Sequence, residues 1–265
     1  MLGKPVAHSL SPVLHRAAYR ALGLTGWSYT AIECDEQGLA GLLAGSGSEV
    51  VGYSCTMPLK RQVLRVASSA SPEATAIGAG NTLLRGPAGW RADNTDWIGI
   101  RDALAAAGMS AGGAVTVLGA GGTAQAALAA LTGAQRVTVL VREPSRAGEL
   151  LAAARRLDRP VTVASLAERQ HWLDADLIIA TLPAGAADRF TDLPFRRDQA
   201  LLDAVYHPWP TPLAGALAAA GAPVISVAAM LLHQAARQVE LMTGSAAPVE
   251  AMRAAIVAAV PGCGA

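Results

Sequence analysis

The chain has 265 residues, 52% of them apolar and 15% charged, and a formal net charge of +1 at pH 7. This size and apolar content favour two globular domains, while the near-neutral charge, with no long lysine and arginine run, argues against nucleic-acid binding. Three widely separated cysteines argue against a disulfide framework or zinc site and broken apolar runs against a membrane span, so we expect a cytoplasmic protein without a bound metal.

The first segment, residues 1–97, is predicted to be an α/β domain. It mixes short runs typical of strands and helices, and no glycine-rich nucleotide motif opens it. Prolines divide it into short elements, among them Pro5, Pro12, Pro58 and Pro72. We therefore expect this segment to form a domain separate from the rest of the chain.

Residues 98–227 have the pattern of a Rossmann-type, doubly wound domain. Short β-branched runs alternate with Ala/Leu-rich helical stretches, which is typical of a parallel sheet with crossover helices. The expected strands are residues 115–118, 136–141, 161–164, 177–180, 200–205 and 223–226.

Two helices are predicted in the last segment, residues 228–265. The first covers about residues 228–242 and the second about 248–260, where Pro248 suits a first helical turn. Periodicity alone does not indicate which domain they pack against.

A glycine-rich loop follows the first strand of the Rossmann-type segment and precedes a helical run at residues 125–131. It reads G-x-G-x-x-A, and its residues are Gly119, Ala120, Gly121, Gly122, Thr123 and Ala124. In this motif Gly119 permits the tight turn, Gly121 lets the backbone approach a pyrophosphate, and Ala124 permits close packing of helix on strand. The strand before and the helix after favour a dinucleotide site over an ordinary glycine-rich turn.

The end of the next strand bears on the choice of cofactor. An NAD enzyme commonly has an acidic residue there, whereas this chain has Val141 and Arg142. Arg142 and Arg146 are suited to a ribose 2′-phosphate, which predicts NADP and makes NAD the lesser alternative. Glu143 leaves two readings open, because it can pair with an arginine or hydrogen-bond a ribose hydroxyl.

Three polar groups interrupt the first segment. The first contains Ser9 and Ser11, two residues apart on one side of a predicted extended stretch, with hydroxyls suited to a carboxylate. The second covers residues 54–60 and ends at Lys60, and the third comprises residues 81–82 and 93–96. A lysine, an asparagine and an aspartate that converge on a small polyol would orient its hydroxyls and move a proton.

These groups resemble the motifs of the shikimate dehydrogenase family. The family's G-x-P-x-x-H-S-x-S-P, N-V-T-x-P-x-K, G-A-x-N-T and D-N-T-D correspond in order to residues 3–12, 54–60, 78–82 and 93–96. The similarity continues through the glycine loop to Asp203, Tyr206, Met230 and Gln234, so it covers nearly the whole chain. It implies an NADP-dependent oxidoreductase that interconverts 3-dehydroshikimate and shikimate in aromatic amino-acid biosynthesis.

The resemblance also implies roles for individual residues. Lys60 and Asp96 would be the catalytic pair, and Ser9 and Ser11 would hold the substrate carboxylate. The other substrate-binding residues would be Ser54, Thr56, Asn81, Tyr206 and Gln234, and the cofactor site would add Val205 and Val227 to the glycine loop and arginines. By the same resemblance, residues 1–97 bind substrate, residues 98–227 bind NADP, and the C-terminal helices return to the substrate domain and lay Gln234 over the cleft.

The chain departs from the family pattern at four places. Ser54 stands for the usual asparagine, Trp97 and Val227 stand where glycine is common, and residues 180–183 replace the usual N-A-T-S. Two alternatives stay open: a quinate/shikimate dehydrogenase with broader cofactor use, and a non-catalytic ligand sensor on the same fold. The presence of Lys60 and Asp96 favours the enzyme, which we expect to be a monomer or homodimer.

Several residues have plainer readings. Asp96 is also suited to N-cap the helix that begins near Trp97. Cys55 is expected to point into the core and Asp203 to be structural, while His8 and His15 have no partner at motif spacing and are left out of catalysis.

Overall fold

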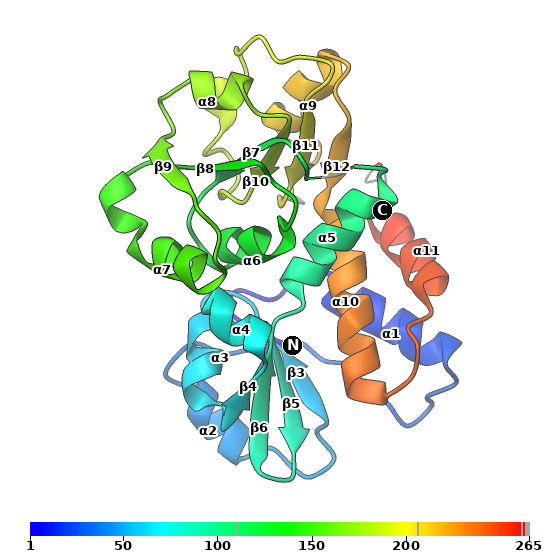
Figure 1. Ribbon diagram of the computed structural model, residues 1–265. Coiled ribbons are helices and arrows are strands. Elements are labelled where there is room, and N and C mark those ends of the chain that lie inside the picture. The colour runs from blue at the N-terminus through cyan, green and yellow to red at the C-terminus, as the bar shows by residue number, and fades with distance from the viewer. Residues whose placement is uncertain (110, 206, 261, 263–265) are drawn as a thin grey trace.

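The computed structural model describes residues 1–109, 111–205, 207–260 and 262, and it has two α/β lobes (Figure 1). A six-stranded sheet forms the upper lobe, and a four-stranded sheet with a separate two-stranded pair belongs to the lower lobe. The predicted α/β fold class is therefore confirmed. The predicted boundaries at residues 97 and 227 remain a proposal for where the domains divide.

The upper lobe has the parallel, doubly wound sheet that the sequence predicts. Its strand order is β12-β11-β10-β7-β8-β9, and every neighbouring pair is parallel. The strands are β7 (Ala114–Leu118), β8 (Arg136–Val141), β9 (Thr162–Ser165), β10 (Leu177–Ala180), β11 (Ala200–Asp203) and β12 (Val224–Ser226). The order reverses beside β7, whose carboxyl end leads into the glycine loop, and this is where such sheets bind ligands.

Helices connect the strands of this lobe on both faces of the sheet. They are α6 (Gly122–Ala130), α7 (Gly148–Arg156), α8 (Gln170–Leu173) and α9 (Pro212–Ala219), with short 3₁₀ turns at Pro144–Arg146 and Asp188–Phe190. Helix α9 begins where the Thr211 hydroxyl accepts a hydrogen bond from the Ala214 amide, and Pro212 occupies its first turn. The core on one face contains Val117, Leu128 and Ile179 among its fully buried side chains.

Two predicted boundaries in this lobe are wrong by two residues or more, and several others differ by one residue. Strand β11 ends at Asp203 rather than 205, because the Asp203 carboxylate accepts a hydrogen bond from the Val205 amide at 3.0 Å and turns the chain. Helix α6 begins at Gly122 rather than 125, so the helix takes in the second half of the glycine loop.

The four-stranded sheet of the lower lobe has the order β3-β5-β6-β4. Strands β3 (Gly52–Ser54), β5 (Thr82–Gly86) and β6 (Gly89–Asp93) are antiparallel, and β4 (Ser69–Ala70) pairs parallel with β6. Strand β1 (Leu2–Gly3) pairs with β2 (Ile32–Glu33), and the helices are α1 (Ser11–Ala21), α2 (Leu39–Ala44), α3 (Lys60–Val66) and α4 (Pro72–Ile77). Cys55 is buried beside Leu2 and Leu59, so its predicted inward direction is confirmed.

Ser9 and Ser11 do not lie in an extended segment, which corrects the sequence prediction. Ser11 is the first residue of α1, because Pro12 favours the first turn of a helix. The Ser11 amide donates to the Ser9 hydroxyl at 3.2 Å, and this hydrogen bond bends the chain immediately before the helix.

Helices α5 (Asp96–Ala106) and α10 (Val227–Thr243) join the two lobes, and α11 (Val249–Ala259) packs beside α1 and α10 (Figure 1). Helix α10 packs along α5, and a methyl group on Gly99 would lie 2.6 Å from the Met230 carbonyl oxygen, so glycine permits this close approach. Both C-terminal helices share a core with Leu14 and Ala18 of α1. The predicted return of the last helices to the first domain is therefore confirmed.

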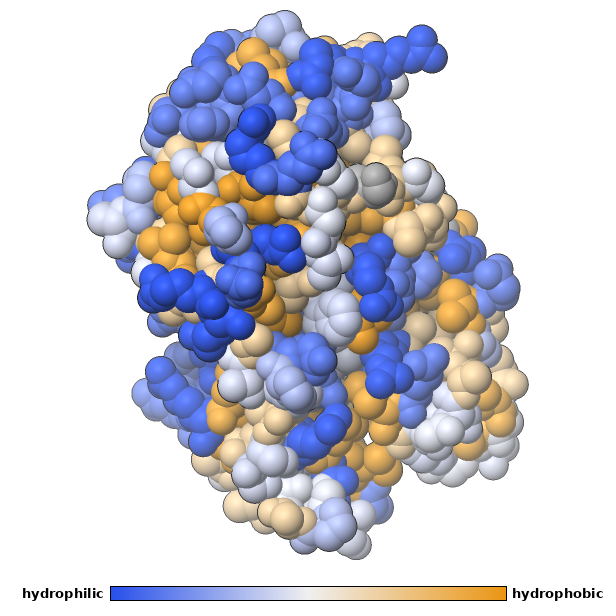
Figure 2. Space-filling view, in the orientation of Figure 1, coloured by the Kyte–Doolittle hydropathy of each residue, from blue (hydrophilic) through white to orange (hydrophobic). Residues whose placement is uncertain are grey.

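Hydrophilic and apolar residues are distributed unevenly over the outer surface of the upper lobe. Figure 2 shows hydrophilic residues over the top of the upper lobe and apolar residues lower on that lobe, towards its junction with the lower one. Among the described residues, no helix is both long and apolar enough to cross a membrane.

Candidate active site

A cavity of about 330 Å³ lies at the junction of the two lobes. The segment that leads into α1, the β3–α3 loop and α10 form most of its wall, and Thr123 in the first turn of α6 lines one side. The structure brings together ten of the residues singled out in the sequence: Ser9, Ser11, Ser54, Thr56, Lys60, Asn81, Asp96, Thr123, Val227 and Gln234. Tyr206, which the sequence also singled out, lies outside the described residues.

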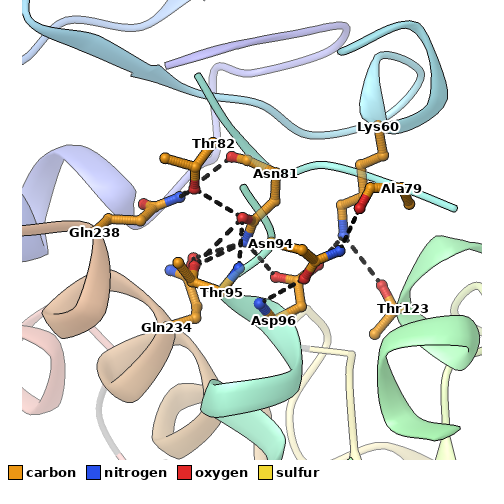
Figure 3. Close-up of polar contacts among 10 residues, drawn as sticks. All are labelled: Lys60, Ala79, Asn81, Thr82, Asn94, Thr95, Asp96, Thr123, Gln234 and Gln238. Carbon is orange, nitrogen blue, oxygen red and sulfur yellow. Dashed lines mark hydrogen bonds and ion pairs between the residues drawn. The ribbon is translucent and has the colours of Figure 1, made fainter. Parts of the chain in front are cut away.

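Lys60 and Asp96 form an ion pair in this cavity (Figure 3). The Lys60 ammonium donates to Asp96 Oδ2 at 2.6 Å, and it also donates to the Thr123 hydroxyl at 3.2 Å. The lysine side chain is 20% exposed and the aspartate side chain 7%, so solvent reaches the ammonium more than the carboxylate. A half-buried ammonium that faces a cavity can stabilise negative charge that develops on a bound molecule.

The Asp96 carboxylate is held from its other side by an asparagine. Asn81 Nδ2 donates to Asp96 Oδ1 at 2.8 Å, and the Asp96 amide donates to Asn94 Oδ1 at 2.9 Å. Thr95, not Asp96, occupies the N-cap position of α5, so the alternative N-cap role for Asp96 is wrong. The aspartate belongs to the first helical turn, and its carboxylate is engaged by Lys60 and Asn81 instead.

A buried polar cluster behind Ser54 was not predicted from the sequence. The Tyr29 hydroxyl donates to Ser54 Oγ at 2.6 Å, and Ser54 donates to Gln238 Oε1 at 2.7 Å. Nothing in the local pattern singles out Tyr29, because it reaches the site only through the fold. Gln238 carried a usable signal, since it lies one helical turn after Gln234 and thus on the same face of α10.

Burial makes two titratable groups near the cavity chemically inactive at neutral pH. Desolvation lowers the pKa of His15 to about 3, although a hydrogen bond with Gln238 opposes the shift. Desolvation likewise raises the pKa of the Cys55 thiol to about 12. A neutral histidine and a protonated thiol agree with their omission from the predicted catalytic residues.

A second cavity, of about 540 Å³, lies over the glycine loop at the carboxyl end of the upper sheet. Gly119 has φ of +106°, a conformation that favours glycine, and a methyl group on Gly121 would meet nothing within 4 Å. Helix α6 therefore presents its first amides to open space, which suits a phosphate group. A methyl group on Gly122 would lie 3.3 Å from Lys60 Cδ, so this glycine leaves room for the lysine.

Arg142, Glu143 and Arg146 line the far end of this second cavity. Arg146 Nη1 lies 3.4 Å from Glu143 Oε2, and both side chains are largely exposed, so the pair contributes little and is easily rearranged. The structure shows Glu143 paired with Arg146, and because this pair is weak, the choice between the two readings of Glu143 stays a prediction.

The sequence predicts that Val205 and Val227 both lie beside the nicotinamide of the cofactor. In the structure these two residues line different cavities. Val227 begins α10 and lies in the wall of the first cavity. Val205 lines a small adjoining pocket with Asp203, whose carboxylate accepts from the Thr211 hydroxyl at 2.6 Å. Burial raises the pKa of Asp203, and its bonds hold the chain after β11, in line with a structural role.

A parallel sheet with a glycine loop, next to a substrate-sized cavity that contains a lysine–aspartate pair, defines the class of two-domain dehydrogenases that use a nicotinamide dinucleotide. Residues 1–83 match the shikimate dehydrogenase substrate binding domain, and residues 229–257 match the shikimate 5′-dehydrogenase C-terminal domain. The chain belongs to the shikimate dehydrogenase family.

Individual relatives cover almost the whole chain. A shikimate dehydrogenase (NADP⁺) from Citrifermentans bemidjiense is 36% identical over 97% of this chain and 93% of the relative. The crystal structure of Mycobacterium tuberculosis shikimate dehydrogenase has a TM-score of 0.88 and 45% identity and covers 97% of each chain. The Thermus thermophilus enzyme, solved in complex with NADP(H) and shikimate, has a TM-score of 0.85, 34% identity and the same coverage.

Proposed function

We propose that this chain is an NADP-dependent shikimate dehydrogenase, which reduces the ketone of 3-dehydroshikimate to the alcohol of shikimate and catalyses the reverse reaction. The observation that carries the proposal is the Lys60–Asp96 ion pair, 2.6 Å long, placed beside the first turn of the glycine-loop helix. Family membership and the names of the relatives support the same activity.

Lys60 is proposed to supply the proton and the positive charge. The nicotinamide ring, when bound, supplies the hydride. The Lys60 ammonium donates a hydrogen bond to the ketone oxygen and gives up a proton as that oxygen becomes an alcohol. Asp96 keeps the ammonium directed at the oxygen and accepts a hydrogen bond from a neighbouring substrate hydroxyl.

The remaining polar groups of the first cavity are proposed to orient the substrate. Ser9 and Ser11, close together at the start of α1, donate their hydroxyl hydrogens to its carboxylate. The ring and its hydroxyls are contacted by Ser54, Thr56, Asn81 and Gln234, with Tyr206 proposed as a further contact.

The second cavity fits the proposed cofactor. The pyrophosphate is held by the loop residues Gly119, Ala120, Gly121, Gly122, Thr123 and Ala124 at the N-terminus of α6. Arg142 and Arg146 would provide guanidinium groups for a ribose 2′-phosphate, and Val205 and Val227 would adjoin the nicotinamide. NAD, which lacks that phosphate, is the weaker ligand.

The test is an absorbance assay of the nicotinamide that crosses shikimate and quinate with NADP⁺ and NAD⁺. The proposal expects the highest kcat/KM with shikimate and NADP⁺. A higher kcat/KM with quinate would identify a quinate/shikimate dehydrogenase instead, and binding of shikimate without turnover would identify a ligand sensor.

We also propose that the enzyme is cytoplasmic and acts as a monomer or homodimer. The cysteines in the described part of the chain, Cys34 and Cys55, are buried free thiols, which suits a reducing compartment. Light scattering coupled to size-exclusion chromatography distinguishes one chain of 26.9 kDa from two.

A further inference from the structure

A continuous hydrogen-bonded network runs from α1 to the Lys60–Asp96 pair. It starts at His15, passes through Gln238, Thr82 and Asn81, and ends on the Asp96 carboxylate (Figure 3 shows it from Gln238 onward). All five residues are at most 5% exposed, so water hardly competes for their hydrogen bonds. The direction of each hydrogen bond in this network can be derived from the backbone groups at its ends, because a carbonyl oxygen can only accept and an amide N–H can only donate.

The amide of Gln238 has only one possible orientation. One end of it contacts the Asn81 carbonyl oxygen at 3.2 Å, and a carbonyl oxygen can only accept, so the nitrogen lies at that end. The same nitrogen then donates to the Thr82 hydroxyl at 2.8 Å. Gln238 Oε1 therefore points the other way, and its neighbours Ser54 and His15 must both donate to it.

The orientation of Gln238 determines that of Thr82, and Thr82 is one of two donors that hold the Asn81 side chain. The Thr82 oxygen accepts from Gln238, so its own hydrogen is free to donate to Asn81 Oδ1 at 2.8 Å. The Thr95 amide donates to the same oxygen at 2.8 Å, so two donors converge on one end of the Asn81 side chain. Asn81 Nδ2 is consequently turned towards Asp96 Oδ1.

We propose that Gln238 is a positioning residue of the active site: through the Thr82 hydroxyl, its amide holds Asn81 in the orientation that donates to the Asp96 carboxylate. Thr82 does not line the cavity and acts only through Asn81. Gln238 reaches the cavity wall, but its amide nitrogen is committed to the Asn81 carbonyl and Thr82. The inference rests on the proposed function, because the direction of Asn81 affects turnover only if Asp96 works with Lys60.

The kinetic test uses a matched pair of substitutions at Thr82. Thr82→Val keeps the shape of the side chain and removes the hydroxyl, whereas Thr82→Ser keeps the hydroxyl. We expect Thr82→Val to lower kcat with shikimate and NADP⁺ by about tenfold, the effect of one misplaced hydrogen bond, with the KM for NADP⁺ unchanged. Thr82→Ser is expected to retain most of the native kcat at the same temperature, and thermal unfolding shows that both variants are folded.

A second variant tests Gln238 itself. Gln238→Glu keeps the length of the side chain but replaces the amide nitrogen with an oxygen, so the Thr82 hydroxyl turns to donate to the new carboxylate and Asn81 Oδ1 loses one of its two donors. We expect a loss of kcat similar to that of Thr82→Val. Equal kcat values for the native enzyme and the folded Thr82→Val variant would overturn the proposal, while a native enzyme inactive with every substrate would overturn the proposed function instead.

A measurement without turnover tests the direction of the network. Because His15 must donate to Gln238 Oε1, its proton lies on Nε2, 3.2 Å away, and its ring is neutral. Nitrogen-15 spectra of histidine-labelled native protein, with the His15 signal identified by its loss in His15→Phe, are expected to show a protonated Nε2 and a bare Nδ1. A proton on Nδ1 alone would mean that Gln238 faces the opposite way, and it would overturn the proposal whatever the activity.

Discussion

Lys60 and Thr123 connect the two lobes at the point where substrate and cofactor are proposed to meet. The Lys60 ammonium belongs to the first turn of α3 in the lower lobe, and it donates at 3.2 Å to a hydroxyl in the first turn of α6 in the upper lobe. Thr123 was predicted from the sequence only as part of the glycine loop. Its contact with Lys60 means that the group proposed to move the proton lies beside the loop proposed to hold the cofactor.

The first prediction concerns Lys60. Lys60→Ala is expected to lower kcat on the order of 10²- to 10⁴-fold, the usual range for a general acid, because the ammonium interacts most strongly with the developing alkoxide. Shikimate should still bind, and isothermal titration calorimetry alongside the absorbance assay measures both quantities. Turnover close to the native value would exclude Lys60 as the proton donor.

The second prediction concerns the proposed carboxylate anchor. Ser9→Ala or Ser11→Ala is expected to raise the KM for shikimate by about tenfold, the effect of one lost hydrogen bond to a charged group. The kcat should change less, because the carboxylate is held equally in the ground state and the transition state. An unchanged KM in the double variant would count against the anchor, and the KM for NADP⁺ is the internal control.

The third prediction concerns cofactor choice. Arg142→Ala is expected to raise the KM for NADP⁺ by about tenfold, because a 2′-phosphate loses a charge-assisted hydrogen bond that contributes about 1.5 to 3 kcal/mol before solvent screening. The KM for NAD⁺ should hardly change. Glu143→Ala is the matched variant and should move discrimination further towards NADP⁺, whereas more efficient use of NAD⁺ by the native enzyme would show that Glu143 binds the ribose hydroxyls.

The fourth prediction concerns pH and His15, whose pKa of about 3 in the folded protein lies below its ordinary value of 6.5. Between these values the unfolded chain binds a proton that the folded chain does not, so stability is present above about pH 6.5 and is lost as the pH falls. His15 alone should lower the free energy of unfolding by about 1.4 kcal/mol per pH unit in this window.

The control for this pH effect is His15→Phe, which keeps a ring against Tyr29 and cannot titrate. Urea unfolding between pH 6 and pH 4 should give a shallower pH dependence for this variant, even though it is less stable at pH 7. Identical slopes for the two proteins would show that His15 is protonated in the folded state.

The fifth prediction concerns the packing of α5 on α10. Gly99→Ala is expected to destabilise the protein by about 1 to 3 kcal/mol, because the added methyl group would lie 2.6 Å from the Met230 carbonyl oxygen and the helices must separate. Gly215→Ala is the matched control, since a methyl group there meets nothing within 4 Å and removing a helical glycine stabilises by about 1 kcal/mol. If the calorimetric melting temperatures of Gly99→Ala and Gly215→Ala moved in the same direction, the predicted steric conflict at Gly99 would be wrong.

Features whose signals lie within one element could be predicted from the amino-acid sequence. The parallel sheet was predicted because each buried strand is a short β-branched run between helical stretches, and the glycine loop because its turn needs glycine at Gly119. The candidate site residues were singled out because they stand in short ordered motifs. The described ones, except Gly122 and the fully buried Ala124, line the two main cavities or the small pocket that contains Val205.

The sharing of hydrogen bonds between distant side chains became visible only in the folded molecule. His15, Tyr29, Ser54 and Gln238 come from α1, the chain before β2, β3 and α10, and no sequence spacing relates them. The bend at Ser9 and the N-cap at Thr95 were also misjudged, because one local hydrogen bond settles each of them. The Ser11 amide donates to the Ser9 hydroxyl, and the Gly99 amide donates to the Thr95 carbonyl oxygen. The bonds between distant side chains depend on where each backbone lies once the elements are packed, and hydrophobic periodicity carries no information about that.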